Sequence, residues 1–211
     1  MNGFKEITRE VIPYKDSKGN IVAYKIPNLI DPLTLEILNR YFYTVEWQDE
    51  SKYTIPLANI NFGDRTCYAV GNDVLTIAML ETYTPLIKIV MDRDVLPSYT
   101  YTRVYEKNTH LISHRDRSSC EISMSVNLFQ EGSELEPFYI SKKPLEKSLK
   151  NDITKISSWP GDAIIFTGQA RSDGHYHWRD PTKSEQHLQC FFHWVYADGD
   201  FAENAYEYRN K

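Results

Sequence analysis

The residues best suited to chemistry in this sequence are a histidine and an aspartate that lie one residue apart. His114 and Asp116 stand in the segment HLISHRDRSSCEISMSVNL and offer an imidazole and a carboxylate from one stretch of chain. Two histidines and one carboxylate on one face of an octahedral ion are typical of non-haem Fe(II), and the opposite face stays open for other ligands. Because a His-x-Asp pair arises easily by chance, the prediction depends on a third ligand elsewhere in the chain.

A second cluster, GQARSDGHYHWRD, contains two histidines about sixty residues after Asp116. It follows the segment PGDAIIFTG, whose Pro-Gly-Asp turn leads into an apolar strand. Either His175 or His177 can supply the third ligand.

The alternation of side chains after the His-x-Asp pair predicts where the pair points. From Cys120 to Leu128 every second residue is apolar, and the residues between them are polar. Side chains alternate across a strand. If this alternation continues back through the turn, His114 and Asp116 share the apolar face, and we expect them at the mouth of a β core.

Short strands with turn signals must carry these residues, which favours a sandwich or a barrel. The expected strands cover residues 98–107, 110–116, 120–129, 136–141, 154–159, 162–168 and 187–196. Upstream, residues 1–30 indicate a short β region with a turn at Lys18-Gly19-Asn20. One helix should begin at Asp31-Pro32, and a second should begin after Asp73 and be kinked or split by Pro85.

The bulk composition indicates one ordinary globular domain. The chain has 211 residues and a formal net charge of −5, which argues against a nucleic-acid backbone as partner. Three irregularly spaced cysteines indicate a reducing compartment. No signal-peptide pattern opens the sequence, and no apolar run approaches the ~20 residues of a membrane span, so we expect a cytoplasmic protein without a membrane partner.

Taken in order, the motifs TYTRVY, HRD, WPGDAIIF, HYHWRD and HLQCFFHWV resemble those of the Fe(II)/2-oxoglutarate-dependent dioxygenases. The resemblance is to the prolyl-4-hydroxylase-like branch, including small prokaryotic and phage-type members, and it covers roughly residues 99–196. It implies a mainly β fold of the α+β class, with a double-stranded β-helix (jelly-roll) core flanked by helices. We expect a single domain, 1–211, in which a strand and helix region, 1–96, packs on a core, 97–211.

The same resemblance implies the site and the reaction. His114, Asp116 and His177 would hold Fe(II), with His175 in reserve for the third place. With 2-oxoglutarate as cosubstrate and O₂, such an enzyme hydroxylates a C–H bond and releases succinate and CO₂. Tyr105 lies near the place where the family has a tyrosine that contacts the cosubstrate.

One departure from the family concerns the anchor for the far carboxylate of 2-oxoglutarate. The family usually has an arginine or lysine about ten residues after the distal histidine, where this chain has His187. A carboxylate buried without a cation is costly, so some base should be near. Arg103 and a protonated His187 are candidates of equal rank, and Lys183 is a third.

Two other classes of protein stay open. A cupin-like metal protein would use both His175 and His177, although no glutamate follows at the expected spacing. A non-catalytic jelly-roll binding module would use its many aromatic residues on a ligand or partner surface. The sequence does not indicate the oligomeric state, and peptidyl, prolyl, amino-acid, nucleobase and other small-molecule substrates are all compatible with it.

Overall fold

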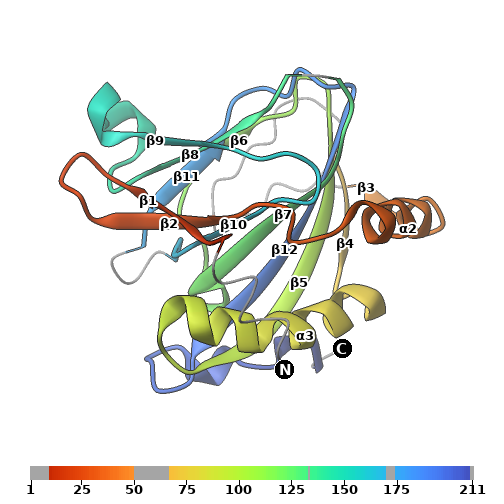
Figure 1. Ribbon diagram of the computed structural model, residues 1–211, viewed down its shortest axis with the longest axis horizontal. Coiled ribbons are helices and arrows are strands. Elements are labelled where there is room, and N and C mark those ends of the chain that lie inside the picture. The colour runs from red at the N-terminus through yellow and green to blue at the C-terminus, as the bar shows by residue number, and fades with distance from the viewer. Residues whose placement is uncertain (1–9, 50–66, 133, 170–173, 210–211) are drawn as a thin grey trace.

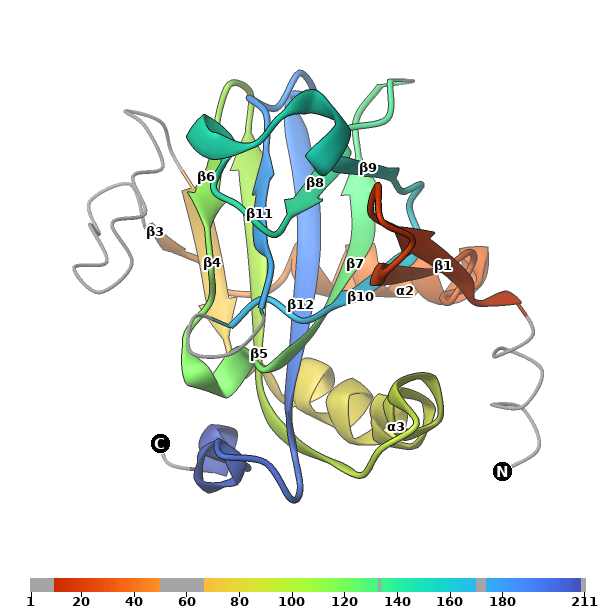
Figure 2. The same ribbon diagram turned by 90° about the vertical axis from the view of Figure 1, so that its left-hand side faces the viewer.

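The computed structural model of the chain describes residues 10–49, 67–132, 134–169 and 174–209. Within these ranges the strands form a large and a small antiparallel sheet that face each other (Figures 1 and 2). The large sheet has the order β1 (Ile12–Lys15), β2 (Ile21–Ile26), β10 (Ala163–Phe166), β7 (Ile122–Gln130), β12 (Gln186–Tyr196), β5 (Val95–Glu106), β4 (Cys67–Gly71) and β3 (Gln48–Asp49). The small sheet has the order β6 (Leu111–His114), β11 (Tyr176–Arg179), β8 (Pro137–Ser141) and β9 (Thr154–Ser157).

Strands β5 to β12 divide equally between the two sheets, an arrangement consistent with the predicted jelly roll. The expected strands are found with boundaries shifted by a few residues. β3, β4 and β11 are additional strands, and β11 lies within the second histidine cluster. The β1–β2 hairpin turns at Gly19, whose φ of 87° suits glycine. The division of the chain at residue 97 stays a prediction, and strands from both sides of it share the large sheet.

Two helices pack on the large sheet, and both begin at the predicted caps. Asp31 accepts hydrogen bonds from backbone N–H groups at the start of α2 (Pro32–Phe42), and Asp73 does the same for α3 (Val74–Met91). The prediction that Pro85 splits the second helix was wrong, because α3 runs through it without interruption. A proline removes only one N–H from the helix ladder, and the neighbouring Thr84 hydroxyl bonds the Leu80 carbonyl at 2.9 Å.

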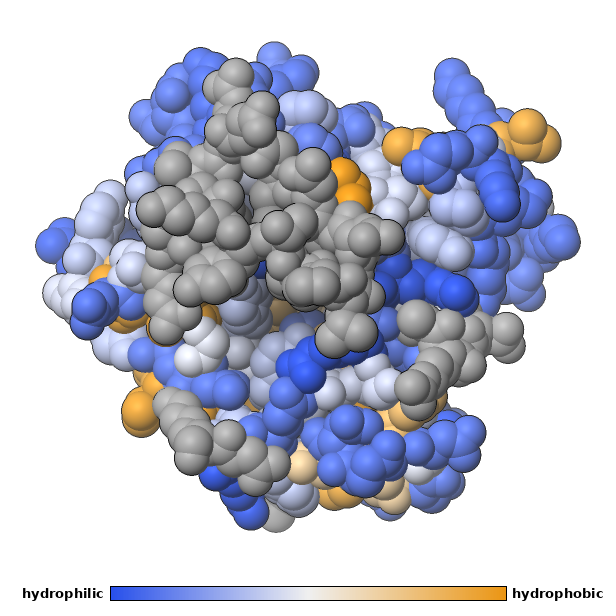
Figure 3. Space-filling model, turned by 180° about the vertical axis from the view of Figure 1, so that it is seen from behind, coloured by the Kyte–Doolittle hydropathy of each residue, from blue (hydrophilic) through white to orange (hydrophobic). Residues whose placement is uncertain are grey.

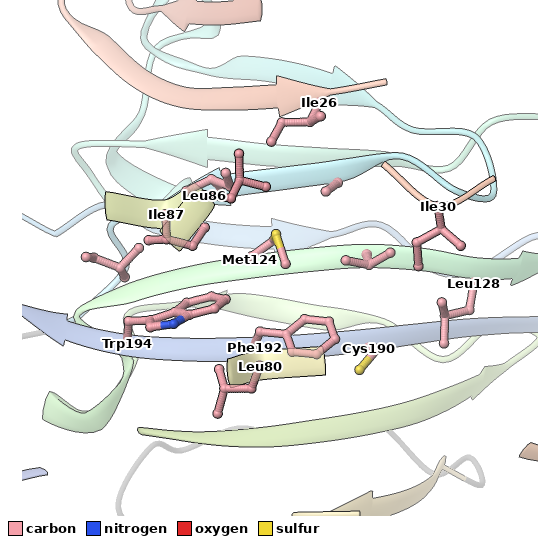
Figure 4. Close-up of a cluster of buried hydrophobic side chains, with 14 of the residues drawn as sticks. Ile26, Ile30, Leu80, Leu86, Ile87, Met124, Leu128, Cys190, Phe192 and Trp194 are labelled. Carbon is pink, nitrogen blue, oxygen red and sulfur yellow. The ribbon is translucent and has the colours of Figure 1, made fainter. Parts of the chain in front are cut away.

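The main hydrophobic core lies between α3 and the outer face of the large sheet. In Figure 4, Leu80, Leu86 and Ile87 of α3 lie beside Trp194 of β12 and Met124 of β7, and all five side chains are fully buried. By length and composition α3 could cross a membrane; here one side of it, with Leu80, Leu86 and Ile87, packs on the large sheet.

Short 3-10 helices complete the described structure, at Ser118–Cys120, Leu145–Lys147, Lys150–Asp152, Ala202–Asn204 and Glu207–Arg209. A second, smaller apolar cluster joins the two sheets at one end, with Phe138 and Ile140 of β8 against Ile164 and Phe166 of β10. On the face seen in Figure 3, hydrophilic residues predominate over the described surface, and hydrophobic ones appear only in small separate areas. The apolar residues therefore serve mainly the interior.

Candidate metal centre

Three predicted ligands meet where β6 ends and β11 begins. His114 and His177 are paired across these neighbouring strands, and their Nε2 atoms lie 3.3 and 3.5 Å from Oδ1 of Asp116. Their ligand atoms all lie within 4.8 Å of one another, which is close enough for one ion to contact all three. The structure therefore brings together the residues that the sequence proposed as a metal site.

Backbone carbonyl groups orient both imidazole rings. Nδ1 of His114 lies 2.8 Å from the Ile112 carbonyl oxygen, and Nδ1 of His177 lies 3.4 Å from the His175 carbonyl oxygen. A carbonyl oxygen only accepts hydrogen bonds, so each Nδ1 donates its proton there and Nε2 is the ring nitrogen left for a metal ion. Both rings therefore turn toward Asp116 the nitrogen that binds a metal ion.

Gly168 allows the chain after β10 to approach the ligands closely. Its carbonyl oxygen accepts a hydrogen bond from the Asp116 backbone N–H at 2.7 Å, which holds the carboxylate in place. A Cβ atom on Gly168 would lie 2.9 Å from Asp116 Oδ2 and 3.0 Å from His177 Cε1, so any larger residue would collide with two ligands. The sequence did not single out Gly168, and its signal is a glycine two residues after the end of a buried strand.

The electrostatics of the cluster suit a divalent cation. Burial alone would raise the pKa of Asp116, but His177 and His114 together hold this pKa well below its usual range. Burial lowers the pKa of His177, and the nearby Asp116 only partly opposes this effect. An ionised carboxylate and a histidine whose pKa is lowered by burial form a donor set that suits a metal ion.

The expected orientation of the pair relative to β7 was wrong. Ser123, on the polar face of β7, donates a hydrogen bond to Asp116 Oδ2 at 3.3 Å, whereas Met124 on the apolar face packs in the helix-covered core. The 3-10 turn Ser118–Cys120 lies between the pair and β7 and interrupts the strand alternation. The ligands therefore point into the space between the sheets, which the polar face of β7 lines.

His175 lies outside the cluster. It is buried, and its Nδ1 is 3.3 Å from the Thr167 carbonyl oxygen. His175 and His177 belong to one chain segment, but only His177 shares the ligand group with His114 and Asp116.

No family model and no curated protein sequence matches the chain. Solved structures do match it. A 2OG-Fe(II) oxygenase family oxidoreductase from Burkholderia pseudomallei has a TM-score of 0.62 at 10% identity, over 82% of this chain and 85% of that one. HygX from Streptomyces hygroscopicus, with nickel, 2-oxoglutarate and hygromycin B bound, has a TM-score of 0.60 at 11% identity, over 94% and 88%. The viral collagen prolyl hydroxylase of Paramecium Bursaria Chlorella virus-1, in complex with 2OG, has a TM-score of 0.54 at 15% identity. The match covers 84% of this chain and 97% of that one.

This chain has the 2OG-Fe(II) oxygenase fold. The predicted resemblance is thus confirmed at the level of the fold, and prolyl hydroxylases are among the structures that share it. Beyond the metal ligands, β11 and β12 carry further buried polar residues, Arg179, His187 and Gln189.

Arg179 is a buried cation on the same strand as the ligand His177. It lies two residues after His177 on β11, so both side chains point to the same side of the strand. It is 4% exposed, and its Nη atoms donate to the Glu136 carbonyl oxygen at 3.4 Å and to Gln189 Oε1 at 3.3 Å. Its Nε is buried and has no hydrogen-bond partner in the described residues.

His187 is placed differently from its predicted role as a protonated anchor. It is fully buried, with Nδ1 3.1 Å from Glu136 Oε2 and Nε2 against the side-chain amide nitrogen of Gln189. Burial lowers the pKa of His187, and Glu136 only partly opposes the shift. Both ring nitrogens are engaged and the ring is neutral, so His187 supports Gln189 rather than offering a charge.

The other predicted cosubstrate residues occupy two different environments. Arg103 is 6% exposed and donates to the Tyr101 hydroxyl at 3.1 Å, and its guanidinium lies 5.7 Å from the ring centre of Tyr105. Tyr105 is buried beside His187. Arg103 and Tyr105 therefore both belong to the interior. Lys183 is exposed and pairs with Glu134 at 2.8 Å, which directs its charge to the surface.

Proposed function

We propose that this protein is a non-haem Fe(II) oxygenase that uses 2-oxoglutarate and O₂ to hydroxylate a C–H bond of a small-molecule or peptidyl substrate. The observation that carries the proposal is the convergence of two imidazole Nε2 atoms and one carboxylate oxygen within 4.8 Å. Succinate and CO₂ would be the co-products. Among proteins with this fold, HygX has hygromycin B bound and the viral enzyme is a collagen prolyl hydroxylase, so both substrate classes have precedents.

The donor set fits Fe(II) by its chemistry. His114, Asp116 and His177 would hold the ion, and Fe(II) with its cosubstrate would supply the oxidation of the C–H bond by O₂. The Ile112 and His175 carbonyl groups keep both Nε2 lone pairs aimed inward. The rings of Phe138 and Phe166, 5.6 and 4.7 Å from that of His177, exclude water from one side of the ligands.

Arg179 is the residue that we propose for the far carboxylate of 2-oxoglutarate. Its buried Nε without a partner is the feature expected of a cation that awaits an anion. Two residues along a strand span about 6.6 Å. This is comparable to the length of 2-oxoglutarate, a five-carbon dicarboxylate whose keto acid end would bind the metal beside His177. A guanidinium can bind a carboxylate through two parallel hydrogen bonds. Arg103 stays the second candidate. Tyr105, whose ring lies near the Arg103 guanidinium and the His187 ring, would contact the cosubstrate.

The geometry favours an oxygenase over the two alternatives. A cupin-like site would need both histidines of the second cluster, and His175 lies outside the ligand group. A binding module without catalysis would not need three metal-ligating groups in matched protonation states. The cytoplasmic location stays part of the proposal.

Anaerobic addition of Fe(II) and 2-oxoglutarate to the purified protein tests the proposal directly. A weak visible charge-transfer band, followed by succinate formation on exposure to O₂, is the expected result. His114→Ala and Asp116→Ala should each abolish both signals, while Lys183→Ala, which changes an exposed residue, should retain them. Absence of the band in the wild-type protein would favour the binding module, and full turnover by either ligand variant would refute the triad.

A further inference from the structure

A directed chain of hydrogen bonds leads from the metal ligands to His193 on β12. Ser123 donates its only hydroxyl hydrogen to Asp116 Oδ2 at 3.3 Å. The Ser123 oxygen lies 3.0 Å from Nδ1 of His193, so Nδ1 must be the donor in that contact. Burial lowers the pKa of His193 to about 4, which agrees with a neutral ring. Nε2 of His193 therefore carries a lone pair and no proton.

Nε2 is the open end of this chain. It has no hydrogen-bond partner among the described residues, and it is not one of the buried polar atoms that are sealed from solvent. The ring is held in place by Tyr99, on which it stacks with centroids 4.3 Å apart. The Arg117 guanidinium lies 4.4 Å from the centre of the same tyrosine ring. The ring, which is 6% exposed, is thus fixed in position by contacts that do not use Nε2.

The neighbours of His193 on the large sheet are aromatic. Across the β5–β12 pairing, His193 is opposite Tyr99, and Phe191 is opposite Tyr101. These three aromatic side chains are only partly buried, although the strand positions beside them at Arg103 and Gln189 are buried. Flat apolar surfaces therefore flank one hydrogen-bond acceptor close to the Asp116 side of the ligand group.

We propose that His193 orients the primary substrate by accepting a hydrogen bond from a hydroxyl or amine group of that substrate. This inference rests on the proposed function, because the substrate is that of the same oxygenase site. The preferred substrate is then a small molecule that carries an O–H or N–H donor near the oxidised carbon. A peptidyl proline has no backbone N–H, so the proline residue itself cannot make this contact.

Two substitutions test the roles of the two ring nitrogens of His193 separately. In His193→Asn the side-chain amide can keep the donor to Ser123, but the acceptor at the Nε2 position is lost. In His193→Gln the longer side chain places an amide oxygen near the Nε2 position. Since a site built around a hydrogen bond discriminates strongly against a missing partner, the asparagine variant should lose substrate stimulation and the glutamine variant should retain more of it.

The protonation of the ring can be measured without turnover. Nitrogen NMR of the protein loaded with Zn(II), which is diamagnetic, and 2-oxoglutarate should show His193 protonated at Nδ1 and unprotonated at Nε2 at neutral pH. A ring protonated at Nε2 overturns the proposal, because it could not accept a hydrogen bond there.

Succinate formation by the Fe(II)-loaded protein tests the substrate class. The probes are amino sugars, aminocyclitols and free amino acids, and a proline-rich peptide. Each donor-bearing probe is paired with a derivative in which the hydroxyl is O-methylated or the amine is converted to a quaternary trimethylammonium group. A donor-bearing probe should raise succinate formation, its methylated partner should not, and His193→Asn should reduce the stimulation at least roughly tenfold, the value of one hydrogen bond to a neutral group. Stimulation by the peptide alone, by no donor-bearing probe, or equally in His193→Asn overturns the proposal. Absence of the charge-transfer band in the wild-type protein with Fe(II) and 2-oxoglutarate would instead refute the oxygenase function itself.

Discussion

Replacement of Arg179 by glutamine should weaken 2-oxoglutarate binding while leaving the metal ligands intact. Arg179 is 4% exposed, and each of its Nη atoms already donates one hydrogen bond to a neutral oxygen, which leaves the Nε hydrogen and one hydrogen on each Nη for an anion. Each hydrogen bond to a charged group contributes roughly 1.5–3 kcal/mol. Glutamine retains one donor and no charge, so we expect a loss of about 3 kcal/mol, which corresponds to a roughly hundredfold higher Kd.

Anaerobic titration of the Fe(II)-loaded protein with 2-oxoglutarate, followed by the charge-transfer band, measures this Kd. Lys183→Gln is the matched control, because it removes one positive charge from an exposed position that pairs with Glu134. It should change the Kd by less than about twofold, as expected for a surface ion pair. Arg103→Gln, measured in parallel, compares the second candidate under the same conditions.

A cosubstrate without the far carboxylate makes the test specific. The wild-type protein should prefer 2-oxoglutarate over 2-oxovalerate, which has the same keto acid end, and Arg179→Gln should lose most of this preference. If Arg179→Gln kept both the affinity and the preference, the reasoning from its buried Nε would be refuted. If Arg103→Gln alone lost the preference, the anchor would be on β5.

Three further predictions concern the ligands and the stability. In equilibrium dialysis, His177→Ala should abolish stoichiometric Fe(II) binding, whereas His175→Ala should retain it. Loss of binding in His175→Ala but not in His177→Ala would identify His175 as the third ligand instead. Burial would raise the pKa of Glu136, but the interactions with His187 outweigh it and lower this pKa to about 2. The ionised carboxylate therefore stabilises the fold above the usual pKa of 4.5, and this stabilisation is lost as the pH falls toward 2. Glu136→Gln should therefore lower the free energy of unfolding at pH 7 by up to about 3 kcal/mol, and urea denaturation at pH 3 should show a smaller difference. Leu80→Ala, at a fully buried position, should cost about 2–5 kcal/mol in the same assay, against less than about 1 kcal/mol for the half-exposed Ile89.

Much of the fold could be predicted because its signals are local. Asp31 and Asp73 cap helices through their own side chains, and the alternation along residues 120–129 reports a strand with two different faces. The direction of those faces could not be predicted, because the 3-10 turn at Ser118–Cys120 changes the phase between the ligand pair and β7. The pair was thus recognised by its residue types, while its orientation depended on tertiary structure.

The outer parts of the site were harder to predict because they depend on contacts between distant residues. Arg179 was overlooked as an anchor, although its spacing of two from His177 places both on one side of β11. His187 could not be excluded from the sequence, since its partner Glu136 lies 51 residues away. Gly168 shows its role only once Asp116 and His177 are placed around it.

The two faces of β7 and β12 also bear on how such a protein could change over time. One face of these strands supplies Ser123, Gln189 and His193 to the reaction space, and the other supplies Met124 and Phe192 to the helix-covered core. Substitutions in the first set alter recognition with little loss of packed volume, and substitutions in the second set alter stability without touching the chemistry. Selection for a new substrate can therefore act on alternate codons of two strands while the intervening codons keep the protein folded.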